Sequence, residues 1–328
     1  MVNMINNAPF ILVIVFLVLG FWLLMKGADF FVEGSSSVAK RLKVPPIIVG
    51  MTVVAMGTSL PETAVSMTAA LEGNNELAVS NVVGSNIFNL MVVIGICAIF
   101  SVVHVNKDTI VRDIPFSVFC AVLLAGLGYL AWGDRSGMML GKADGAVLLL
   151  FFCGYLYIMV RSALKARSEV SENQQEIQIF LSYPKSFLYI VGGAAAIAFG
   201  GNLTVDAASR IAVELGMSQN LVGLTIVAIG TSLPELVTSV VAARKNEVDM
   251  AVGNAVGSNI FNILMVLGIS SVISPVSLIG ENMVDIFVLI GASLIVWGFA
   301  VTGKKVTRTE GISMVCLYLI YSAYIILR

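Results

Sequence analysis

Long apolar stretches, interrupted by short polar segments, run along nearly the whole of this chain. Five of them cover residues 10–24, 116–132, 146–160, 286–301 and 312–327. Their lengths approach or reach roughly 20 residues, which a helix needs to cross a hydrocarbon core about 30 Å thick. Boundaries placed at the polar segments predict ten transmembrane helices, at residues 9–33, 45–71, 77–102, 110–132, 143–163, 186–213, 219–243, 250–273, 283–302 and 309–327. The pattern therefore predicts an all-α membrane protein.

Composition places these helices in lipid rather than in the core of a soluble globule. Of the 328 residues, 58% are hydrophobic and 12% are charged, which leaves too little polar surface to solvate a globule of this size. The four cysteines occur singly in apolar runs, and the only histidine, His104, has no partner at metal-ligand spacing. We therefore expect no zinc site, no cofactor and no enzymatic activity.

Lysine and arginine are distributed unequally between the two sides of this predicted layout. Fourteen fall on one side: Lys40, Arg41, Lys43, Lys107, Arg112, Arg161, Lys165, Arg167, Lys185, Arg244, Lys245, Lys304, Lys305 and Arg308. Four fall on the other: Arg135, Lys142, Arg210 and Arg328. Because cytoplasmic loops carry the excess of basic residues, both termini are predicted to face outward from the cell membrane. The net charge of −1 gives no indication of a nucleic-acid partner.

An internal repeat divides the chain into two similar halves. Residues 50–96 align without a gap with residues 223–269 at a constant offset of 173, and 26 of the 47 positions are identical. The offset extends back through Glu33 and Asp206, so each half is predicted to hold five helices. An odd number of helices inserts the second half upside down, as in many secondary transporters. The predicted domains are repeat 1–163, cytoplasmic linker 164–185 and inverted repeat 186–328.

The polar residues inside these spans are better preserved between the halves than the apolar ones. The motif G-T-S-L-P-E occurs at 57–62 and 230–235, and G-S-N-I-F-N occurs at 84–89 and 257–262. A carboxylate at bilayer depth costs about 2.5–3.5 kcal/mol even on a lenient insertion scale. Glu62 and Glu235 are therefore candidate functional residues.

Spacing within each motif gathers oxygen atoms on one side of a helix. Thr58, Ser59 and Glu62 share one helix face, as do Ser85 and Asn89 at i, i+4. The second half repeats both arrangements with Thr231, Ser232, Glu235, Ser258 and Asn262.

A proline inside each G-T-S-L-P-E motif predicts a break in its helix. Pro61 lacks an amide hydrogen, and its ring crowds the carbonyl group of Gly57, so the helix is expected to kink or unwind there. Pro234 repeats this in the second half. Backbone carbonyl oxygens freed at membrane depth need protein, water or a cation as partner.

Only hard oxygen donors are present in these motifs, with no sulfur or imidazole. Two carboxylates and several neutral oxygens suit a divalent ion that takes six to eight ligands, which favours calcium over magnesium. Hydroxyl and carbonyl oxygens also suit sodium, so one cluster would hold calcium or sodium by turns. Asn81 and Asn254, one turn before Ser85 and Ser258, either line the same face or bridge helices.

The paired motifs resemble the alpha repeats of the sodium/calcium exchanger family. This resemblance implies a central cluster of ion sites and an exchange of three sodium ions for one calcium ion. It also implies that the first and sixth helices, 9–33 and 186–213, slide against the other eight. The implied ligands are Ala55, Thr58, Ser59, Glu62, Ser85, Asn89, Ala228, Thr231, Ser232, Glu235, Ser258 and Asn262.

One position departs from part of that family, because several members carry aspartate where this chain has Asn262. Two acidic ligands instead of three argue against potassium co-transport. The resulting prediction is a potassium-independent, electrogenic sodium/calcium antiporter working by alternating access, with Na⁺, Ca²⁺ and the lipid bilayer as its partners and no protein partner implied. A calcium/proton antiporter and, less favoured, a calcium channel are the alternatives. Neutral oxygen ligands favour sodium over protons, and inverted halves disfavour a symmetric pore.

Overall fold

The computed structural model describes residues 5, 8–72, 75–129, 138–169, 181–217, 222 and 226–327. The first half contains α2 (Phe10–Leu42), α3 (Pro46–Val49), η1 (Gly50–Val54), α4 (Ala55–Thr58), α5 (Leu60–Leu71), α6 (Asn75–Phe88), η2 (Asn89–Val93), α7 (Ile94–Phe100), η3 (Thr109–Asp113), α8 (Ile114–Tyr129) and α9 (Lys142–Glu169). The second half contains α10 (Tyr183–Glu214), α12 (Ala228–Gly230), α13 (Leu233–Arg244), α14 (Val248–Phe261), η5 (Asn262–Val266), α15 (Leu267–Ile273), α16 (Gly280–Gly303) and α17 (Arg308–Leu327). The η segments are π-helices.

The predicted all-α membrane class is confirmed. Eight helices of the described chain are long and apolar enough to cross a membrane, and a bent pair, Pro46–Thr58 with Leu60–Leu71, brings the number to nine. The predicted span 219–243 begins in residues that lie largely outside the described part. Beyond the helices, the described chain has two short antiparallel pairings, β1 (Val103–His104) with β4 (Lys305–Val306) and β2 (Met139–Leu140) with β3 (Val276–Ser277).

Element bounds repeat at the same offset of 173 that relates the two halves of the sequence. Residues 60–71, 75–88, 89–93 and 94–100 form α5, α6, η2 and α7, and adding 173 gives the bounds of α13, α14, η5 and α15. Residues 103–104 and 276–277 are β1 and β3. The repeated sequence is therefore repeated secondary structure, including the π-helical segments. The last helix of the first half differs from its predicted bounds, because α9 continues to Glu169.

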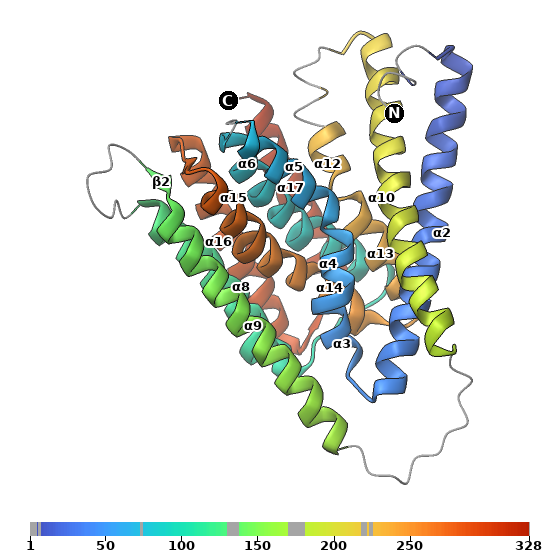
Figure 1. Cartoon of the computed structure of the whole chain (residues 1–328), viewed down its shortest axis with the longest axis vertical. Coiled ribbons are helices and arrows are strands. Elements are labelled where there is room, and N and C mark those ends of the chain that lie inside the picture. The colour runs from blue at the N-terminus through green and yellow to red at the C-terminus, as the bar shows by residue number, and fades with distance from the viewer. Residues whose placement is uncertain are drawn as a thin grey trace.

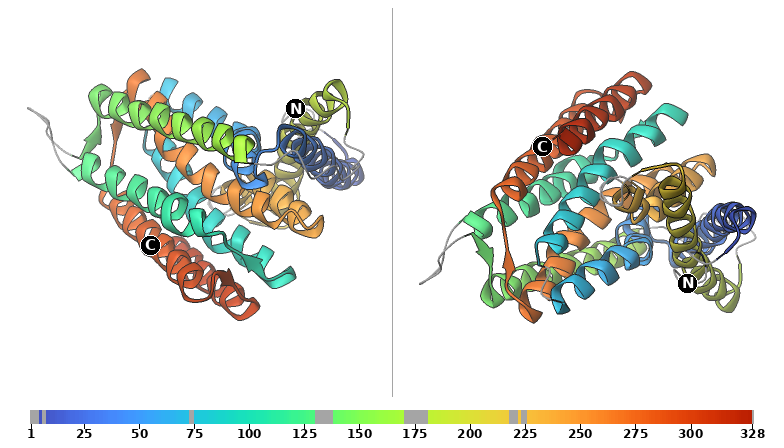
Figure 2. Two further views of the ribbon diagram at one scale, coloured as in Figure 1. Left: turned by 90° about the horizontal axis from the view of Figure 1, so that it is seen from below. Right: turned by 90° about the horizontal axis from the view of Figure 1, so that it is seen from above.

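Two long helices, α2 and α10, lie side by side at one edge of the molecule and run in opposite directions (Figure 1). Both end views keep this helix pair at the edge, beside a bundle formed by the other helices (Figure 2). Glycines make the close approach possible. A Cβ atom on Gly193 would lie 2.7 Å from the Phe31 backbone nitrogen, and one on Gly27 would lie 2.9 Å from the Gly193 carbonyl oxygen.

The interior of the bundle is occupied by the helices that carry the repeated motifs. In the apolar windows of Leu77–Phe100 and Val248–Ile273, 83% and 78% of residues are buried. α14 also packs closely on η1, where a Cβ atom on Gly257 would lie 2.6 Å from Met51 Cα. The polar residues of the motifs therefore face protein rather than lipid.

Candidate ion-binding site

The first G-T-S-L-P-E motif forms a bend in the middle of the helical segment that runs from Pro46 to Leu71. α4 ends at Thr58, Ser59 has φ −83° and ψ 12°, and α5 begins at Leu60 with Pro61 in its first turn. The helical segments on either side differ in direction by 50°. The predicted kink at Pro61 is confirmed. It places Glu62 in the first turn of α5, with its side chain fully buried.

The second motif has the same local geometry. Ser232 has φ −94° and ψ 4°, Pro234 lies in the first turn of α13, and Glu235 is fully buried. Proline at the start of a helix leaves no amide hydrogen unsatisfied, so each break is also a regular helix start. Both glutamates thus lie at a helix N-terminus, where the peptide dipoles favour negative charge.

Each glutamate accepts a hydrogen bond from the serine of the opposite half. Ser59 Oγ donates to Glu235 Oε1 over 2.8 Å, and Ser232 Oγ donates to Glu62 Oε1 over 3.2 Å. Because the donor and the acceptor belong to different halves, the two motifs must lie against each other. The structure therefore brings both carboxylates to one place between the halves.

Asn254 connects the same two halves behind Glu235. Its Oδ1 accepts from Thr58 Oγ1 at 3.0 Å, while its Nδ2 donates to the Glu235 carbonyl oxygen at 3.3 Å and to Ser239 Oγ at 2.9 Å. The amide therefore bridges helices, as one of the two interpretations left open by the sequence expects.

Asn81 makes the matching contacts behind Glu62. Its Oδ1 accepts from Thr231 Oγ1 at 3.5 Å, and its Nδ2 donates to the Glu62 carbonyl oxygen at 3.3 Å and to Ser66 Oγ at 3.0 Å. Ser66 and the equivalent Ser239 were not predicted as site residues. Their identity at the 173-residue offset, four positions after each glutamate, is the signal that identifies them.

Four asparagines join the two G-S-N-I-F-N motifs directly. Asn86 Nδ2 donates to the Asn259 carbonyl oxygen at 3.1 Å, and Asn259 Nδ2 donates to the Asn86 carbonyl oxygen at 3.0 Å. Asn89 Nδ2 donates to Asn259 Oδ1, and Asn262 Nδ2 donates to Asn86 Oδ1, both over 3.2 Å. One amide hydrogen of Asn89 and one of Asn262 are thereby used, and the Oδ1 atom of each has no hydrogen-bond partner among the described residues. Asn89 and Asn262 are also the first residues of π-helices, which are frequent at functional sites.

Six buried side-chain oxygens of the repeated motifs have no hydrogen-bond partner among the described residues. They form three pairs at the 173-residue offset: Glu62 Oε2 and Glu235 Oε2, Ser85 Oγ and Ser258 Oγ, Asn89 Oδ1 and Asn262 Oδ1. The helical segments that carry them are in contact, since α5 touches η5 and α13 touches η2. An unsatisfied buried polar atom costs about 1–3 kcal/mol. A cation bound beside these oxygens would remove that cost.

The predicted site residues are largely brought together, and we call them the polar cluster: Thr58, Ser59, Glu62, Ser85 and Asn89 with Thr231, Ser232, Glu235, Ser258 and Asn262. Thr231 is half-buried and the others are buried. The carbonyl oxygen of buried Ala55 accepts the Ser59 amide at 3.0 Å. Ala228 begins α12, and its side chain lies outside the described part. Within the described residues, no third acidic, histidine or cysteine side chain joins the two glutamates as a metal-binding group.

Comparison with known proteins gives consistent matches over most of the chain. A family model described as sodium/calcium exchanger protein matches residues 12–161 and 185–327. A protein of Alkalimonas amylolytica that carries the name antiporter CaxA is 42% identical over 264 residues, 80% of this chain and 81% of that protein. The sodium/calcium exchanger MaX1 of Methanosarcina acetivorans is 33% identical over 340 residues, 93% of this chain and 96% of that protein.

A solved structure shows the same likeness in three dimensions. The sodium-calcium exchanger NCX_Mj, soaked with Na⁺ and Sr²⁺, is 33% identical to this chain and superimposes with a TM-score of 0.81. The match covers 96% of this chain and 99% of that one.

Proposed function

Because this chain belongs to the sodium/calcium exchanger family, we propose that it exchanges Na⁺ for Ca²⁺ across the membrane at the polar cluster. The observation that carries the proposal is the set of six unpartnered oxygens, three from each half. Calcium takes six to eight oxygen ligands at flexible geometry, and two carboxylates balance its charge. Neutral hydroxyl and amide oxygens in the same set also suit sodium.

Exchange requires that calcium and sodium compete for one cluster. Two carboxylates neutralise one calcium ion, whereas three sodium ions at the same place leave one excess positive charge. Moving one elementary charge across a membrane potential of 100 mV corresponds to about 2.3 kcal/mol. Such a potential would therefore change the equilibrium of the exchange by well over tenfold. We therefore propose an electrogenic exchange of three sodium ions for one calcium ion.

Potassium is excluded from the proposed cycle. Asn262 donates from Nδ2 to Asn86 Oδ1, and an aspartate there has no amide hydrogen to make that bond. Asparagine at position 262 therefore makes a hydrogen bond that aspartate could not make, and the cluster contains two acidic ligands rather than three. Calcium exchange is expected to proceed equally well when choline replaces potassium.

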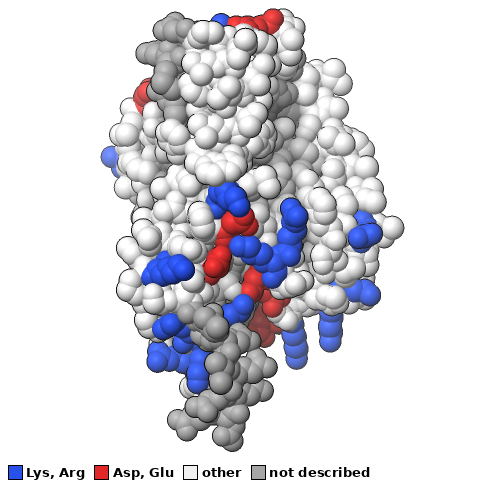
Figure 3. Space-filling model, turned by 90° about the vertical axis from the view of Figure 1, so that its right-hand side faces the viewer, with Lys and Arg blue, Asp and Glu red and all other residues white. Residues whose placement is uncertain are grey.

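Alternating access is proposed to occur by movement of the helix pair against the bundle. The halves repeat their element bounds, and α2 runs opposite to α10, which supports two inverted five-helix repeats, 1–163 and 186–328, joined by the linker 164–185. α2 begins and α17 ends toward the same end of the molecule (Figure 1), while the basic side chains of one face gather toward the other end (Figure 3). This charge distribution supports outward-facing termini and a cytoplasmic basic end.

Calcium-45 uptake into proteoliposomes under imposed gradients tests the proposal. Vesicles loaded with sodium, with potassium, or at acidic internal pH are diluted into the same calcium buffer, with valinomycin setting the potential in parallel samples. We expect uptake only from sodium-loaded vesicles, and we expect an inside-positive potential to accelerate it. Uptake driven by the proton gradient alone would support a calcium/proton antiporter, and gradient-independent flux would support a channel. Sodium-driven uptake that ignores potential would reject the three-for-one ratio.

A further inference from the structure

A buried tyrosine of α9 makes a hydrogen bond to the backbone of η1. Tyr155 is 4% exposed, and its hydroxyl donates to the Met51 carbonyl oxygen at 2.9 Å. The ring of Tyr155 stacks on the ring of Phe116, with centroids 5.7 Å apart and an angle of 6° between the ring planes. The hydroxyl is therefore directed at Met51 by a ring that is itself packed in place.

The Met51 carbonyl group needs this donor because η1 is a π-helix. The Ala55 amide donates to the carbonyl oxygens of Gly50 and Thr52. In a regular α-helix it would donate to Met51, four residues back. A buried carbonyl oxygen without a donor is unfavourable. The Tyr155 hydroxyl therefore takes the place of the hydrogen bond that an α-helix would supply.

η1 leads directly into the polar cluster. α4 follows it and ends at Thr58, in the first G-T-S-L-P-E motif. Met51 also packs against the second half, because a Cβ atom on Gly257 would lie 2.8 Å from the Met51 carbonyl oxygen. Gly257 precedes Ser258, whose hydroxyl oxygen is one of the six unpartnered oxygens described above. A shift at Met51 would therefore displace residues of the polar cluster in both halves.

Loss of the Tyr155 hydroxyl would favour a different backbone at η1. If η1 rewound into a regular α-helix, the Ala55 amide would donate to Met51 again. Because an α-helix has fewer residues per turn than a π-helix, this change would rotate Ala55 and Thr58 relative to the residues before Gly50. The oxygen atoms of the first motif would then leave the positions in which they meet the second half.

A buried tyrosine occurs at the matching place in the second half. Gly145 and Tyr155 of α9 are ten residues apart, as are Gly311 and Tyr321 of α17. The two glycines pack in the same way, since a Cβ atom would lie 2.7 Å from a carbonyl oxygen of α15 at the first and 2.5 Å from one of α7 at the second. Tyr321 is also buried. A buried tyrosine ten residues after this glycine contact is therefore a feature of both halves.

We propose that Tyr155 is a positioning residue for calcium binding. Its hydroxyl keeps η1 in the π-helical form and so holds the oxygen atoms of the first motif in the polar cluster. Tyr155 acts through Met51 and η1 and does not itself contact the ion. This inference rests on the proposed function, because it requires that the polar cluster binds calcium.

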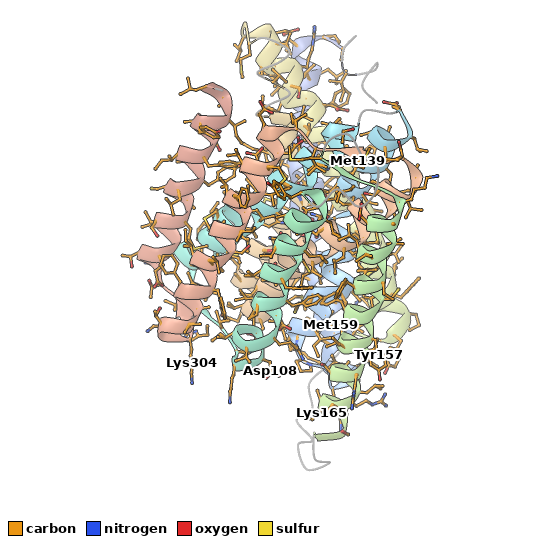
Figure 4. All side chains as sticks on the ribbon, turned by 90° about the vertical axis from the view of Figure 1, so that its left-hand side faces the viewer. Asp108, Met139, Tyr157, Met159, Lys165 and Lys304 are labelled. Carbon is orange, nitrogen blue, oxygen red and sulfur yellow. The ribbon has the colours of Figure 1, made fainter. Side chains whose placement is uncertain are left out.

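Calorimetric titration with calcium and with strontium in sodium-free buffer tests this role. Tyr155→Phe removes the hydroxyl and keeps the stacked ring, so folding is expected to persist and is checked by monodispersity and melting temperature. Tyr157→Phe is the matched control, because Tyr157 lies on the same helix, as Figure 4 shows, but is 65% exposed. Phe116→Leu is a second variant, which keeps the hydroxyl but removes the ring on which Tyr155 stacks.

We expect Tyr155→Phe to raise the calcium Kd roughly tenfold while the number of bound ions stays the same. The ratio of the strontium Kd to the calcium Kd should change about twofold or more, because selectivity between ions of different size depends on how firmly the ligands are held. Phe116→Leu should raise the calcium Kd by a smaller factor, and Tyr157→Phe should leave it unchanged. A purely structural role would lower the number of bound ions or the melting temperature without changing either Kd.

Wild-type Kd values in Tyr155→Phe would overturn the positioning role and leave the proposed function standing. If Tyr155→Phe does not fold, wild-type Kd values in Phe116→Leu would overturn the role instead. An equal loss of affinity in Tyr157→Phe would also overturn it. A wild-type protein that binds no calcium would overturn the proposed function and, with it, the role of Tyr155.

Discussion

The bundle and the helix pair are held together by different kinds of contact. In the bundle, buried hydrogen bonds cross between the halves at Ser59, Ser232, Asn81, Asn254 and the asparagines of the second motif. In the helix pair, 22% of the apolar window of α2 is buried, and glycines let the backbones of α2 and α10 approach closely. Aromatic and cation–π contacts add to this packing, with Phe30 edge-on to Tyr189 and Arg41 over the Tyr183 ring. Hydrogen bonds between polar side chains therefore dominate in the bundle, and close packing dominates in the helix pair.

Polar contacts between the helix pair and the bundle are concentrated toward the basic end. Glu247 accepts from Ser36 Oγ at 2.5 Å and from Lys40 Nζ at 2.6 Å, and Lys245 Nζ donates to the Asp29 carbonyl oxygen at 2.9 Å. Figure 3 shows acidic and basic side chains meeting on this face. A shift of the helix pair breaks these few partly exposed polar contacts, and it also moves Phe31 and Val205 relative to Gly57 and Gly230, which they contact. This difference supports the proposal that the helix pair moves and the bundle holds the ions.

The largest effect is expected from neutralising either glutamate of the bundle. Glu62→Gln or Glu235→Gln removes one unit charge, worth on the order of 4 kcal/mol at 4 Å and an effective dielectric constant of about 20. Calcium flux in proteoliposomes should fall more than 100-fold, with the protein still monodisperse. Glu281→Gln, an exposed glutamate in the first turn of α16, is the matched control and should retain flux. Near wild-type flux in either buried variant would remove the carboxylates from the site.

Removing one serine donor should have a smaller effect than neutralising a glutamate. The two serine variants, one in each half, should weaken calcium binding in the same way. Ser59→Ala removes one hydrogen bond to Glu235, and Ser232→Ala removes one to Glu62. Hydrogen bonds to charged groups contribute about 1.5–3 kcal/mol, so calcium affinity should weaken roughly tenfold or more. Calcium titration by calorimetry measures this. Combining each serine variant with Gln at its partner glutamate should add little, and full additivity would show that the two groups do not interact.

The seam of the helix pair should respond to a single methyl group. Gly193→Ala places a Cβ atom 2.7 Å from the Phe31 nitrogen, whereas neighbouring Gly192 has open space around the same position. Overpacking typically costs about 1–3 kcal/mol, so Gly193→Ala should lower thermal stability and slow exchange with little change in calcium affinity. Gly192→Ala should behave as wild type. Equal melting temperatures for the two variants would mean that the seam is not close-packed.

The smallest effect is expected at the contacts between the two parts. Glu247→Gln weakens the bonds to Ser36 and Lys40, and exposed ion pairs contribute about 0–1 kcal/mol. The exchange rate should change by no more than a fewfold, and the calcium affinity should stay unchanged. Accessibility of a single introduced cysteine to a membrane-impermeant reagent reports the balance between the two orientations. A loss of calcium binding in this variant would contradict the separation of the two parts.

Much of the site follows from the sequence because polar residues stand out in apolar spans. The repeated motifs identify Glu62 and Glu235, and Pro61 predicts the bend that the structure contains. The 173-residue offset shows which residues are equivalent but not which ones touch. The pairing of Ser59 with Glu235 across the halves was therefore not predicted.

The π-helices at Asn89 and Asn262 were also not predicted. Their residues, N-L-M-V-V and N-I-L-M-V, have the apolar character of any buried α-helix, and nothing in their periodicity marks a wider turn. Both segments contact the opposite half, η2 on α13 and η5 on α5, and the sequence does not show these contacts. A pocket of about 760 Å³ at the basic end likewise depends on residues near 45, 110 and 160 that meet only in the folded chain.

The exchange of serine donors between halves has a consequence for ancestry. Each glutamate accepts a hydrogen bond from the serine of the other half. An ancestral half-chain that inserted in both orientations and paired with a second copy would therefore already form both contacts. Fusion of two such copies into one chain fixes their ratio at one to one. After fusion, the sequences of the two halves can change independently. The trace of that release is in the sequence, where 21 of the 47 aligned positions of residues 50–96 and 223–269 differ between the halves.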